Sequence, residues 1–178
     1  MIILITGTPG VGKTTISNIL KEKLDAQLIS INEIVEKKHL YNGIHKEKKY
    51  KIVNMEELFQ ELDSIIGKSD RSNYIIIEGH LSHFYQTSDK VIVLRANPNV
   101  LRKRMEIKGW NETKVQENIE AEALGICSYE AQEIHREKVN EIDTSNLLPH
   151  EVSDLIIEIL KDEKKFPVGN VDFLGYLI

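Results

Sequence analysis

The sequence begins with an apolar run that leads into a glycine-rich loop: Ile2-Ile3-Leu4-Ile5, then Thr6, then Gly7-Thr8-Pro9-Gly10-Val11-Gly12-Lys13-Thr14. The loop matches Gly-x-x-x-x-Gly-Lys-Ser/Thr, a pattern that binds phosphate when a strand precedes it and a helix follows it. Glycines let successive backbone N–H groups converge on phosphate oxygens. The following helix directs its partial positive charge at the same anion. This segment therefore predicts a nucleotide-binding α/β protein.

The polar residues of the loop have distinct expected roles. Lys13 is expected to reach the β- and γ-phosphates, and Thr14 to offer its hydroxyl to Mg²⁺. The backbone of Gly10, Val11 and Gly12 is expected to surround the phosphates.

Composition narrows the class of protein further. The chain has 178 residues, of which 41% are hydrophobic and 29% charged, which predicts one compact domain. Its net charge of −5 argues against a general nucleic-acid binder. A single cysteine, Cys127, indicates a reducing compartment, and we expect a cytoplasmic protein. The first strand starts too early for a signal peptide, and no apolar stretch approaches the roughly 20 residues that a membrane span needs.

Strand and helix patterns alternate along the chain, which is typical of a mostly parallel sheet covered on both faces. Further strands are expected at 28–29, 74–77, 91–94 and 141–144, with 74–77 and 91–94 at the centre of the sheet. A capping box of Ser30 and Glu33 predicts a helix from Ile31. Other helices are expected after the loop and over 54–67, 98–109, 112–124 and 129–139, and from Pro149. Residues 39–50 show no period and are expected to be a solvated excursion.

A second group of candidate residues follows a predicted strand at Glu78-Gly79-His80. Ligand-handling groups gather beyond the carboxyl ends of strands in α/β sheets, so Glu78 and the loop are expected to share one crevice. Glu78 is a candidate metal-organising carboxylate beside Thr14. For His80 two readings stay open: a functional one, in which it orients the attacking group or links the nucleotide site to a mobile element, and a structural one, in which it is a histidine satisfied by hydrogen bonds.

A third group is a positive cluster that follows the strand at 91–94. Its members are Arg95, Arg102, Lys103, Arg104 and Lys108. Arginine grips phosphate at two points, and we expect Arg104 and Lys108 to meet the nucleotide. Arg102 and Lys103 are expected on an exposed helical face, and Gly109 offers a hinge for a lid over 107–117. Arg136 is a further candidate nucleotide-binding residue.

In order and spacing, these segments resemble the adenylate kinase isoenzyme 6 family, also known as the coilin-interacting nuclear ATPase family. The resemblance covers most of the chain and rests on residues 7–15, 78–80, 93–95, 99–101 and 108–112, with support from 40–43 and 117–122.

The resemblance implies a P-loop nucleoside-monophosphate-kinase-like three-layer fold with a parallel sheet. It also implies a monophosphate-binding segment at about 30–53 and a short lid at 107–117. The family transfers phosphate from ATP to AMP with Mg²⁺ and also hydrolyses ATP. It assists maturation of the small ribosomal subunit, as part of the pre-ribosome, through a small-subunit ribosomal protein. On this chain Gly10, Gly12, Lys13, Thr14 and Thr15 would bind ATP phosphates, and Lys13, Glu78, His80 and Arg104 would be catalytic.

The chain also departs from the family pattern. Lys108 stands where relatives commonly have arginine, and Glu78 replaces a frequent aspartate. The monophosphate segment has no arginine, so its lysines would meet the second phosphate: Lys37, Lys38, Lys46, Lys48 and Lys49. Weaker or broader acceptor selection is therefore expected.

Three functions remain open from the sequence. The first is a kinase that passes the γ-phosphate to AMP or another monophosphate. The second is an ATP-driven assembly switch for a ribosomal protein, and the third is a small-molecule kinase with a non-nucleotide acceptor. The apolar tail at 166–178 is expected to fold back onto the domain, with partner docking or self-association as the alternative. The oligomeric state is not indicated.

Overall fold

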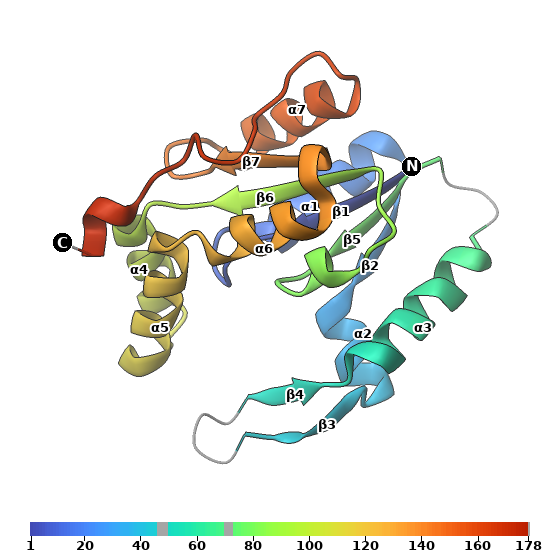
Figure 1. Ribbon diagram of the computed structural model, residues 1–178, viewed down its shortest axis with the longest axis horizontal. Coiled ribbons are helices and arrows are strands. Elements are labelled where there is room, and N and C mark those ends of the chain that lie inside the picture. Colours follow the sequence, from blue (N-terminus) through green and yellow to red (C-terminus); the bar gives the residue numbers. More distant parts are fainter. Residues whose placement is uncertain (46–49, 70–72, 178) are drawn as a thin grey trace.

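The computed structural model describes residues 1–45, 50–69 and 73–177, and Figure 1 shows its arrangement in three layers. The described part holds a five-stranded sheet in the order β2-β5-β1-β6-β7, with every neighbouring pair parallel. The strands are β1 (Ile2–Thr6), β2 (Gln27–Ser30), β5 (Ile75–Glu78), β6 (Lys90–Arg95) and β7 (Val139–Asp143). The predicted three-layer α/β fold with a parallel sheet is confirmed.

The central strand is β1, and the runs predicted for the centre, β5 and β6, lie on either side of it. All three strands are apolar because helices cover both faces of the sheet. Since the strands are parallel, their carboxyl ends meet at one edge, and the phosphate loop leaves β1 at that edge.

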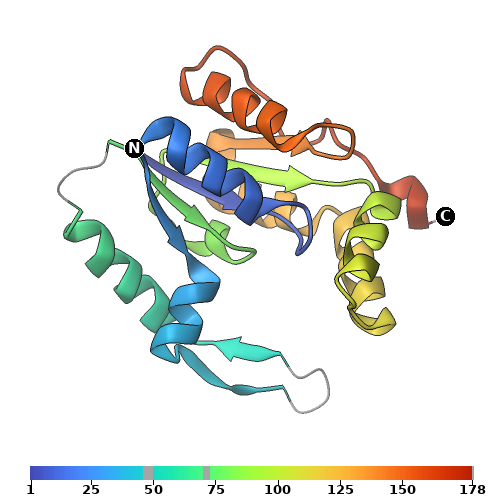
Figure 2. The ribbon, with the colours of Figure 1, turned by 180° about the vertical axis from the view of Figure 1, so that it is seen from behind.

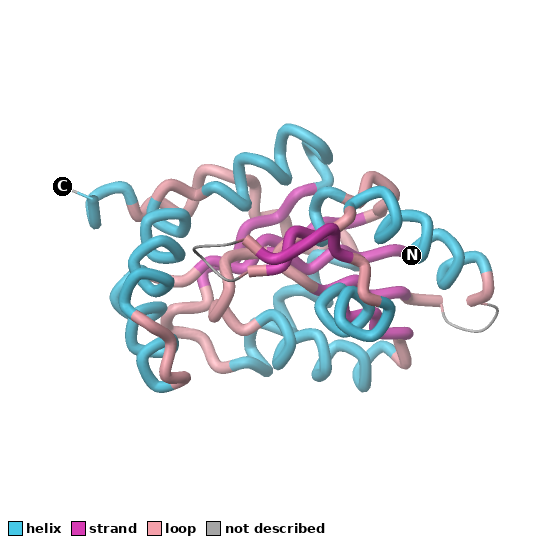
Figure 3. Tube along the Cα trace, turned by 90° about the horizontal axis from the view of Figure 1, so that it is seen from below, coloured by secondary structure: helices cyan, strands magenta, loops and turns pink. Residues whose placement is uncertain are grey.

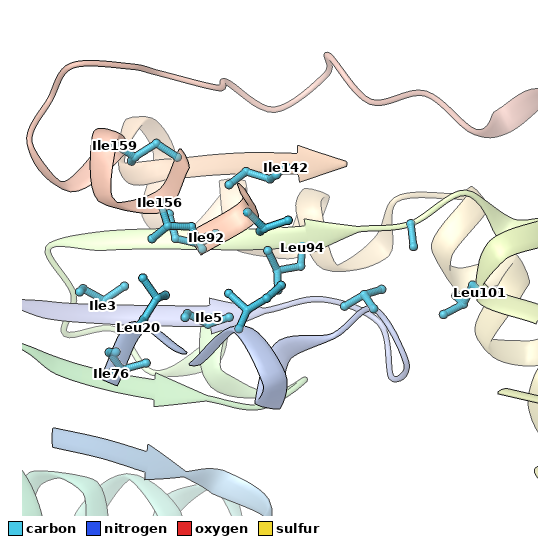
Figure 4. Packing of buried hydrophobic residues seen from close by; sticks show 14 of the residues in the cluster. Ile3, Ile5, Leu20, Ile76, Ile92, Leu94, Leu101, Ile142, Ile156 and Ile159 are labelled. Carbon is cyan, nitrogen blue, oxygen red and sulfur yellow. The ribbon is translucent and has the colours of Figure 1, made fainter. Parts of the chain in front are cut away.

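Two helical layers enclose this sheet (Figures 1 and 2). On one face lie α1 (Lys13–Leu24) and α7 (Pro149–Leu160), and on the other α6 (Ile126–His135) and the short 3₁₀ helix η1 (Ser82–Phe84). Figure 4 shows side chains of Ile3, Ile5, Ile92 and Leu94 packed with Ile156 of α7 and Leu20 of α1. These residues belong to the first of two buried hydrophobic clusters in the described part of the chain. Leu4, Val91 and Val93, which alternate with them along the strands, belong to the second. This alternation follows from the twofold period of a strand.

Two hairpins extend from the carboxyl edge of the sheet. One begins with α2 (Ile31–Lys38) and contains the antiparallel pair β3 (Tyr41–Ile44) and β4 (Lys51–Val53), followed by α3 (Met55–Gly67). The other consists of α4 (Pro98–Ile107) and α5 (Glu112–Ala123), which stand as a separate pair at one end of the molecule (Figure 3). One hairpin therefore lies on each side of the phosphate loop.

Several local expectations were wrong. The sequence shows no period over residues 39–50, yet β3 occupies Tyr41–Ile44 within that range. Lys46, Lys48 and Lys49 lie outside the described residues. The predicted capping box is absent: the Ser30 hydroxyl accepts no hydrogen bond from the first turn of α2 and instead donates to Glu78 of β5. Val139 begins β7 instead of ending a helix, because α6 stops at His135 and the 3₁₀ helix η2 (Arg136–Lys138) intervenes.

Two glycines end helices in different ways. Gly109 has φ +70°, and its N–H donates to Glu106 O at 2.9 Å while Trp110 N–H donates to Met105 O at 3.2 Å. This is the Schellman arrangement, which stops α4 at a left-handed residue. Gly67, by contrast, is the last residue of α3 and lies outside the left-handed region.

The tail folds back along β7, as expected. Glu141 N–H donates to Phe166 O at 2.8 Å, and Phe166 N–H donates to Asn140 Oδ1 at 2.9 Å. Phe166 and Tyr176 pack against the first core cluster, and η3 (Leu174–Leu177) ends the described chain; Ile178 lies outside it. No helix in the described ranges is both long and apolar enough to cross a membrane.

Candidate active site

The phosphate loop between β1 and α1 takes a shape that depends on its glycines. Gly7, Gly10 and Gly12 have φ of +130°, +94° and +109°, a region that other residues rarely adopt. A Cβ on Gly7 would lie 2.2 Å from Leu94 O of the neighbouring strand, so this position also has no room for a side chain. The loop therefore keeps its backbone at the carboxyl edge of the sheet, with the first turn of α1 behind it.

Lys13 lies inside this loop. Its side chain is 8% exposed, and its Nζ donates to Gly7 O at 2.7 Å and to Thr8 O at 3.0 Å. Burial lowers the pKa of the Lys13 ammonium from 10.5 to about 8, although the carboxylates of Glu78 and Glu122 oppose that shift. An anion bound in the loop would provide a negative charge close to the Lys13 ammonium and so stabilise its charged form.

Glu78 and Thr14 meet beside Lys13, as the sequence predicts. Glu78 lies opposite Ile5 of β1 and Ser30 of β2 in the sheet register, at the carboxyl edge. Its carboxylate accepts from the Ser30 hydroxyl at 2.8 Å and from the Thr14 hydroxyl at 3.4 Å. The side chain is only 2% exposed, so this charge is held in place.

This pair fits a magnesium ion bound mainly through other ligands. Mg²⁺ takes oxygen ligands, typically one or two from the protein together with phosphates and waters. The described residues contain no cluster of three or more potential metal-ligating side chains. The donor set therefore suits Mg²⁺ that arrives with a nucleotide.

His80 lies next to this group, half-buried. Burial, followed by the nearby Lys13 charge, lowers the pKa of His80 to about 4, so the ring is neutral near pH 7. The two roles left open for His80 both remain compatible with a neutral ring. The histidine that joins the structural hydrogen bonds here is His83, whose Nδ1 lies 2.7 Å from the Thr6 hydroxyl and whose Nε2 lies 3.1 Å from Glu130 Oε2.

Arg104 and Lys108 reach the other side of the loop. They line a cavity of about 380 Å³ together with loop residues Gly10, Val11 and Gly12, with Thr15 and Ile16 of α1, and with the segment after β7: Thr144, Leu147, Pro149 and Val152. The Arg104 guanidinium donates to Val11 O at 3.4 Å and to Thr144 O at 3.3 Å. The walls supplied by Ile16, Leu147 and Val152 are apolar, which suits a flat heterocycle beside the phosphates.

Other members of the positive cluster do not reach the site. Arg102 pairs with Glu112 at 2.7 Å on the surface of α4 and α5, and Lys103 is exposed, as expected for both. Arg95 is 2% exposed and forms ion pairs with Glu122 and Glu141 inside the protein. Arg136 lies just before β7, at the amino edge of the sheet, so the structure does not bring it to the phosphate loop.

Sequence reasoning missed three residues that fix the site. Thr144, at the end of β7, donates its hydroxyl to Val11 O at 3.2 Å and lies against Arg95 O at 2.9 Å. Thr8 donates its hydroxyl to Glu122 of α5. The ring of His83 shares a hydrogen bond with the hydroxyl of Thr6, the last residue of β1. Each contact joins residues far apart in the chain, and no local pattern marks them.

A phosphate loop at the carboxyl edge of a five-stranded parallel sheet, with an acid and an arginine beside it, defines a P-loop kinase. The model of an AAA domain family matches residues 3–125. Among solved structures, shikimate kinase from Acinetobacter baumannii covers 92% of this chain and 94% of its own, with a TM-score of 0.65 at 18% identity. At that identity the likeness shows the fold alone.

The chain belongs to the family of archaeal proteins that carry the name "Putative adenylate kinase". The relative from Methanothermobacter thermautotrophicus is 44% identical over 99% of both chains. Those from Methanocaldococcus jannaschii and Thermococcus kodakarensis are 41% and 39% identical, over 93% and 97% of this chain and 89% and 93% of their own.

Proposed function

We propose that the protein is an adenylate kinase that transfers the γ-phosphate of MgATP to AMP or another nucleoside monophosphate. The observation that carries the proposal is the continuity of the site. The 380 Å³ cavity opens on Gly10–Gly12 of the phosphate loop, and the Glu78–Thr14 pair lies beside Lys13 of the same loop. The names of the archaeal relatives support adenylate as the substrate class.

The donor side of the site, defined as residues 7–15 with Glu78, Arg104, Lys108 and Thr144, would hold ATP. The adenine would lie in the apolar cavity, and the phosphates would follow the loop N–H groups toward Lys13. Lys13 and Arg104 would balance the charge that develops on the transferring phosphoryl oxygens. Thr14 and Glu78 would hold Mg²⁺, which neutralises phosphate charge and orients the phosphate chain when it is bound.

The acceptor side, defined as residues 30–53, would hold the monophosphate. Lys38 and Lys51 of this segment are paired with Glu61 at 2.7 Å and with Glu36, whereas Lys37 is exposed beside the surface formed by Asn32, Glu33 and Glu36. Lysine is a point charge without the planar fork of arginine. The acceptor side is therefore expected to accept several monophosphates rather than one.

The α4–α5 hairpin would supply the lid. The proposed lid, residues 107–117, spans the end of α4, the turn at Gly109 and the first half of α5. Lys108, at that turn, lines the cavity and would approach the ATP phosphates when the lid moves inward. His80 would orient the attacking phosphate oxygen of the acceptor from the Glu78 side.

The resemblance to the adenylate kinase isoenzyme 6 family supports a second activity, ATP hydrolysis that serves small-subunit ribosome maturation through a ribosomal protein. The two activities predict different products. Purified protein with MgATP should form ADP rapidly only when AMP is added if phosphoryl transfer is the main reaction. Hydrolysis without AMP, raised by a ribosomal protein, would instead make the assembly switch the main function, and transfer to a small alcohol in place of any monophosphate would overturn both.

A further inference from the structure

Thr8 of the phosphate loop is fixed at two points. Its side chain is 3% exposed, and its hydroxyl donates to the carboxylate of Glu122, which lies 114 residues away near the end of α5. Its carbonyl accepts from Lys13 Nζ at 3.0 Å. The residue that carries the Lys13 contact is therefore anchored from outside the loop.

Both carboxylate oxygens and the backbone carbonyl of Glu122 accept hydrogen bonds. One carboxylate oxygen serves Thr8, and the other accepts from Arg95 Nε at 2.8 Å and from Ala96 N–H at 3.0 Å. The Glu122 carbonyl accepts from Arg95 Nη2 at 2.7 Å. Since Glu122 is 1% exposed, water does not compete for these bonds, and its position is set by β6 and the start of the β6–α4 connection.

Arg95 extends the network to the tail. Its guanidinium pairs with Glu141 of β7, and the second oxygen of Glu141 accepts from Gly169 N–H at 3.1 Å and from Val171 N–H at 3.3 Å. The ring of Phe173 lies over the guanidinium, 5.4 Å from Cζ. A continuous series of hydrogen bonds thus runs from the backbone of the tail to the hydroxyl of Thr8.

The charges of this network make its ends interdependent. One buried guanidinium faces two buried carboxylates, so the second negative charge is stabilised by the Thr8 hydroxyl, the Ala96 amide and the tail amides. Loss of a donor at one end leaves a buried carboxylate short of hydrogen bonds, and the remaining groups must shift to compensate.

We propose that Glu122 is a positioning residue of the phosphate loop, and that the tail segment 166–173 acts on that loop through Glu141 and Arg95. Nucleotide phosphates would then bind tightly only when the tail is seated on β7. A partner that lifts the tail would weaken ATP binding without touching the site. This inference rests on the proposed binding of ATP.

The first test removes the Thr8 hydroxyl in the full chain. Thr8→Val keeps the shape of the side chain, and we expect MgATP affinity to fall about tenfold, as for a hydrogen bond to a charged group. Thr8→Ser restores the hydroxyl and is expected to restore most of the affinity. Displacement of a fluorescent ATP analogue measures affinity, and the kinase assay should show a rise in KM for ATP that exceeds the fall in kcat.

Ser153→Ala is the matched control. It removes another buried hydroxyl, which donates to His150 O at 2.7 Å in α7. It is expected to lower the melting temperature while leaving ATP affinity unchanged. Thr8→Val binding as tightly as wild type, while Lys13→Ala does not bind, would overturn this inference alone. A wild-type protein that does not bind MgATP would overturn the proposed function together with it.

The second test is a double-mutant cycle between the two ends. Glu141→Gln is expected to weaken MgATP binding about threefold in the wild-type background and less in the Thr8→Val background, because coupled sites are not additive. Where Glu141→Gln does not fold, Phe173→Leu takes its place in the cycle. Fully additive effects would overturn the action of the tail on the loop.

Discussion

The donor side and the acceptor side of the site are built in opposite ways. On the donor side two charged groups are buried and partnered: Lys13 by loop carbonyls, and Glu78 by Ser30 and Thr14. On the acceptor side the two short strands expose Ile44 and Ile52, at 55% and 46%, and the charges lie at the surface. The phosphate loop is enclosed by buried groups, whereas the acceptor side joins the core through Ile31 and Val35 of α2 and exposes the outer residues of its two strands.

This difference teaches where the chemistry is decided. Preorganised groups in a buried setting stabilise developing charge most strongly, so we expect the donor side to set the rate of the proposed transfer. The acceptor segment carries lysines and no arginine, so we expect it to discriminate only weakly among monophosphates. Substitutions on the donor side should therefore have large effects on kcat, and those on the acceptor side small effects on KM.

The largest effect is expected for Lys13→Ala. Loss of the ammonium removes charge stabilisation at the transferring phosphate, and kcat should fall by about 10³-fold or more, in the range seen for a single transition-state donor. A coupled ADP-formation assay checks this result. Lys21→Ala, an exposed lysine of the same helix α1, is the control and should retain wild-type activity. Unchanged ATP affinity and turnover in Lys13→Ala would contradict the assignment of the loop.

Glu78→Gln should have the next largest effect. The amide keeps the size of the side chain but weakens Mg²⁺ binding, and activity at fixed Mg²⁺ is expected to fall by about 10–100-fold. Titration of activity against Mg²⁺ should show a higher half-saturating concentration. Glu22→Gln, exposed on α1, serves as the control. An unchanged Mg²⁺ requirement would show that Glu78 does not organise the metal.

Arg104→Lys should cost about tenfold in kcat/KM, roughly the value of one charge-assisted hydrogen bond. The lysine keeps the positive charge but cannot reach both Val11 O and Thr144 O. Steady-state kinetics with ATP as the varied substrate measures the loss. Lys103→Ala, on the exposed face of α4, should behave as wild type. Equal losses in the two variants would mean that general charge, not position, matters.

On the acceptor side, Lys37→Ala should raise the KM for AMP only about threefold, as for one exposed charge. ATP hydrolysis without AMP should not change, because the donor side is untouched. The comparison variant is Lys38→Ala, which loses its ion pair with Glu61. A fall in kcat with either variant would break the division between the two sides.

The smallest expected effect is a pH dependence of the free energy of unfolding, caused by two histidines near the donor side, His83 and His135. Burial lowers the pKa of His83 and of His135, whose rings contact Thr6 and Ser88. The unfolded chain takes up protons below about pH 6.5 while these rings stay neutral, so the free energy of unfolding should fall as pH drops below that value. Urea denaturation at pH 7.5 and 5.5 measures the change. His135→Gln should reduce it, whereas His39→Gln, on the exposed surface, should not.

The sequence predicts the fold and the donor side because their signals are local. The loop pattern and the apolar runs of β1, β5 and β6 each lie within a few consecutive residues, and core burial enforces them. The start of the helix predicted over 54–67 is also a local signal, since Asn54 Oδ1 accepts from Glu57 N–H at 3.3 Å.

Features that depend on distant partners were not predictable in this way. Ser30 has the sequence of a capping residue, but its hydroxyl is turned to Glu78 of the neighbouring strand and makes no capping bond with α2. The strands of the β3–β4 hairpin have only four and three residues, too few to show an alternating apolar pattern. Thr8 and Glu122 come together only when the last turn of α5 meets the carboxyl end of β6, which no spacing along the chain reveals.

The position of the tail beside β7 has a consequence for association between molecules. An edge strand with free N–H and C=O groups can serve as a template for a strand of another chain. Glu141 and Asn140 of β7 already bond to Phe166 of the same chain. Strand addition by a second molecule at this border would first have to peel the tail away, so the segment that seats the phosphate loop also guards the sheet against aggregation.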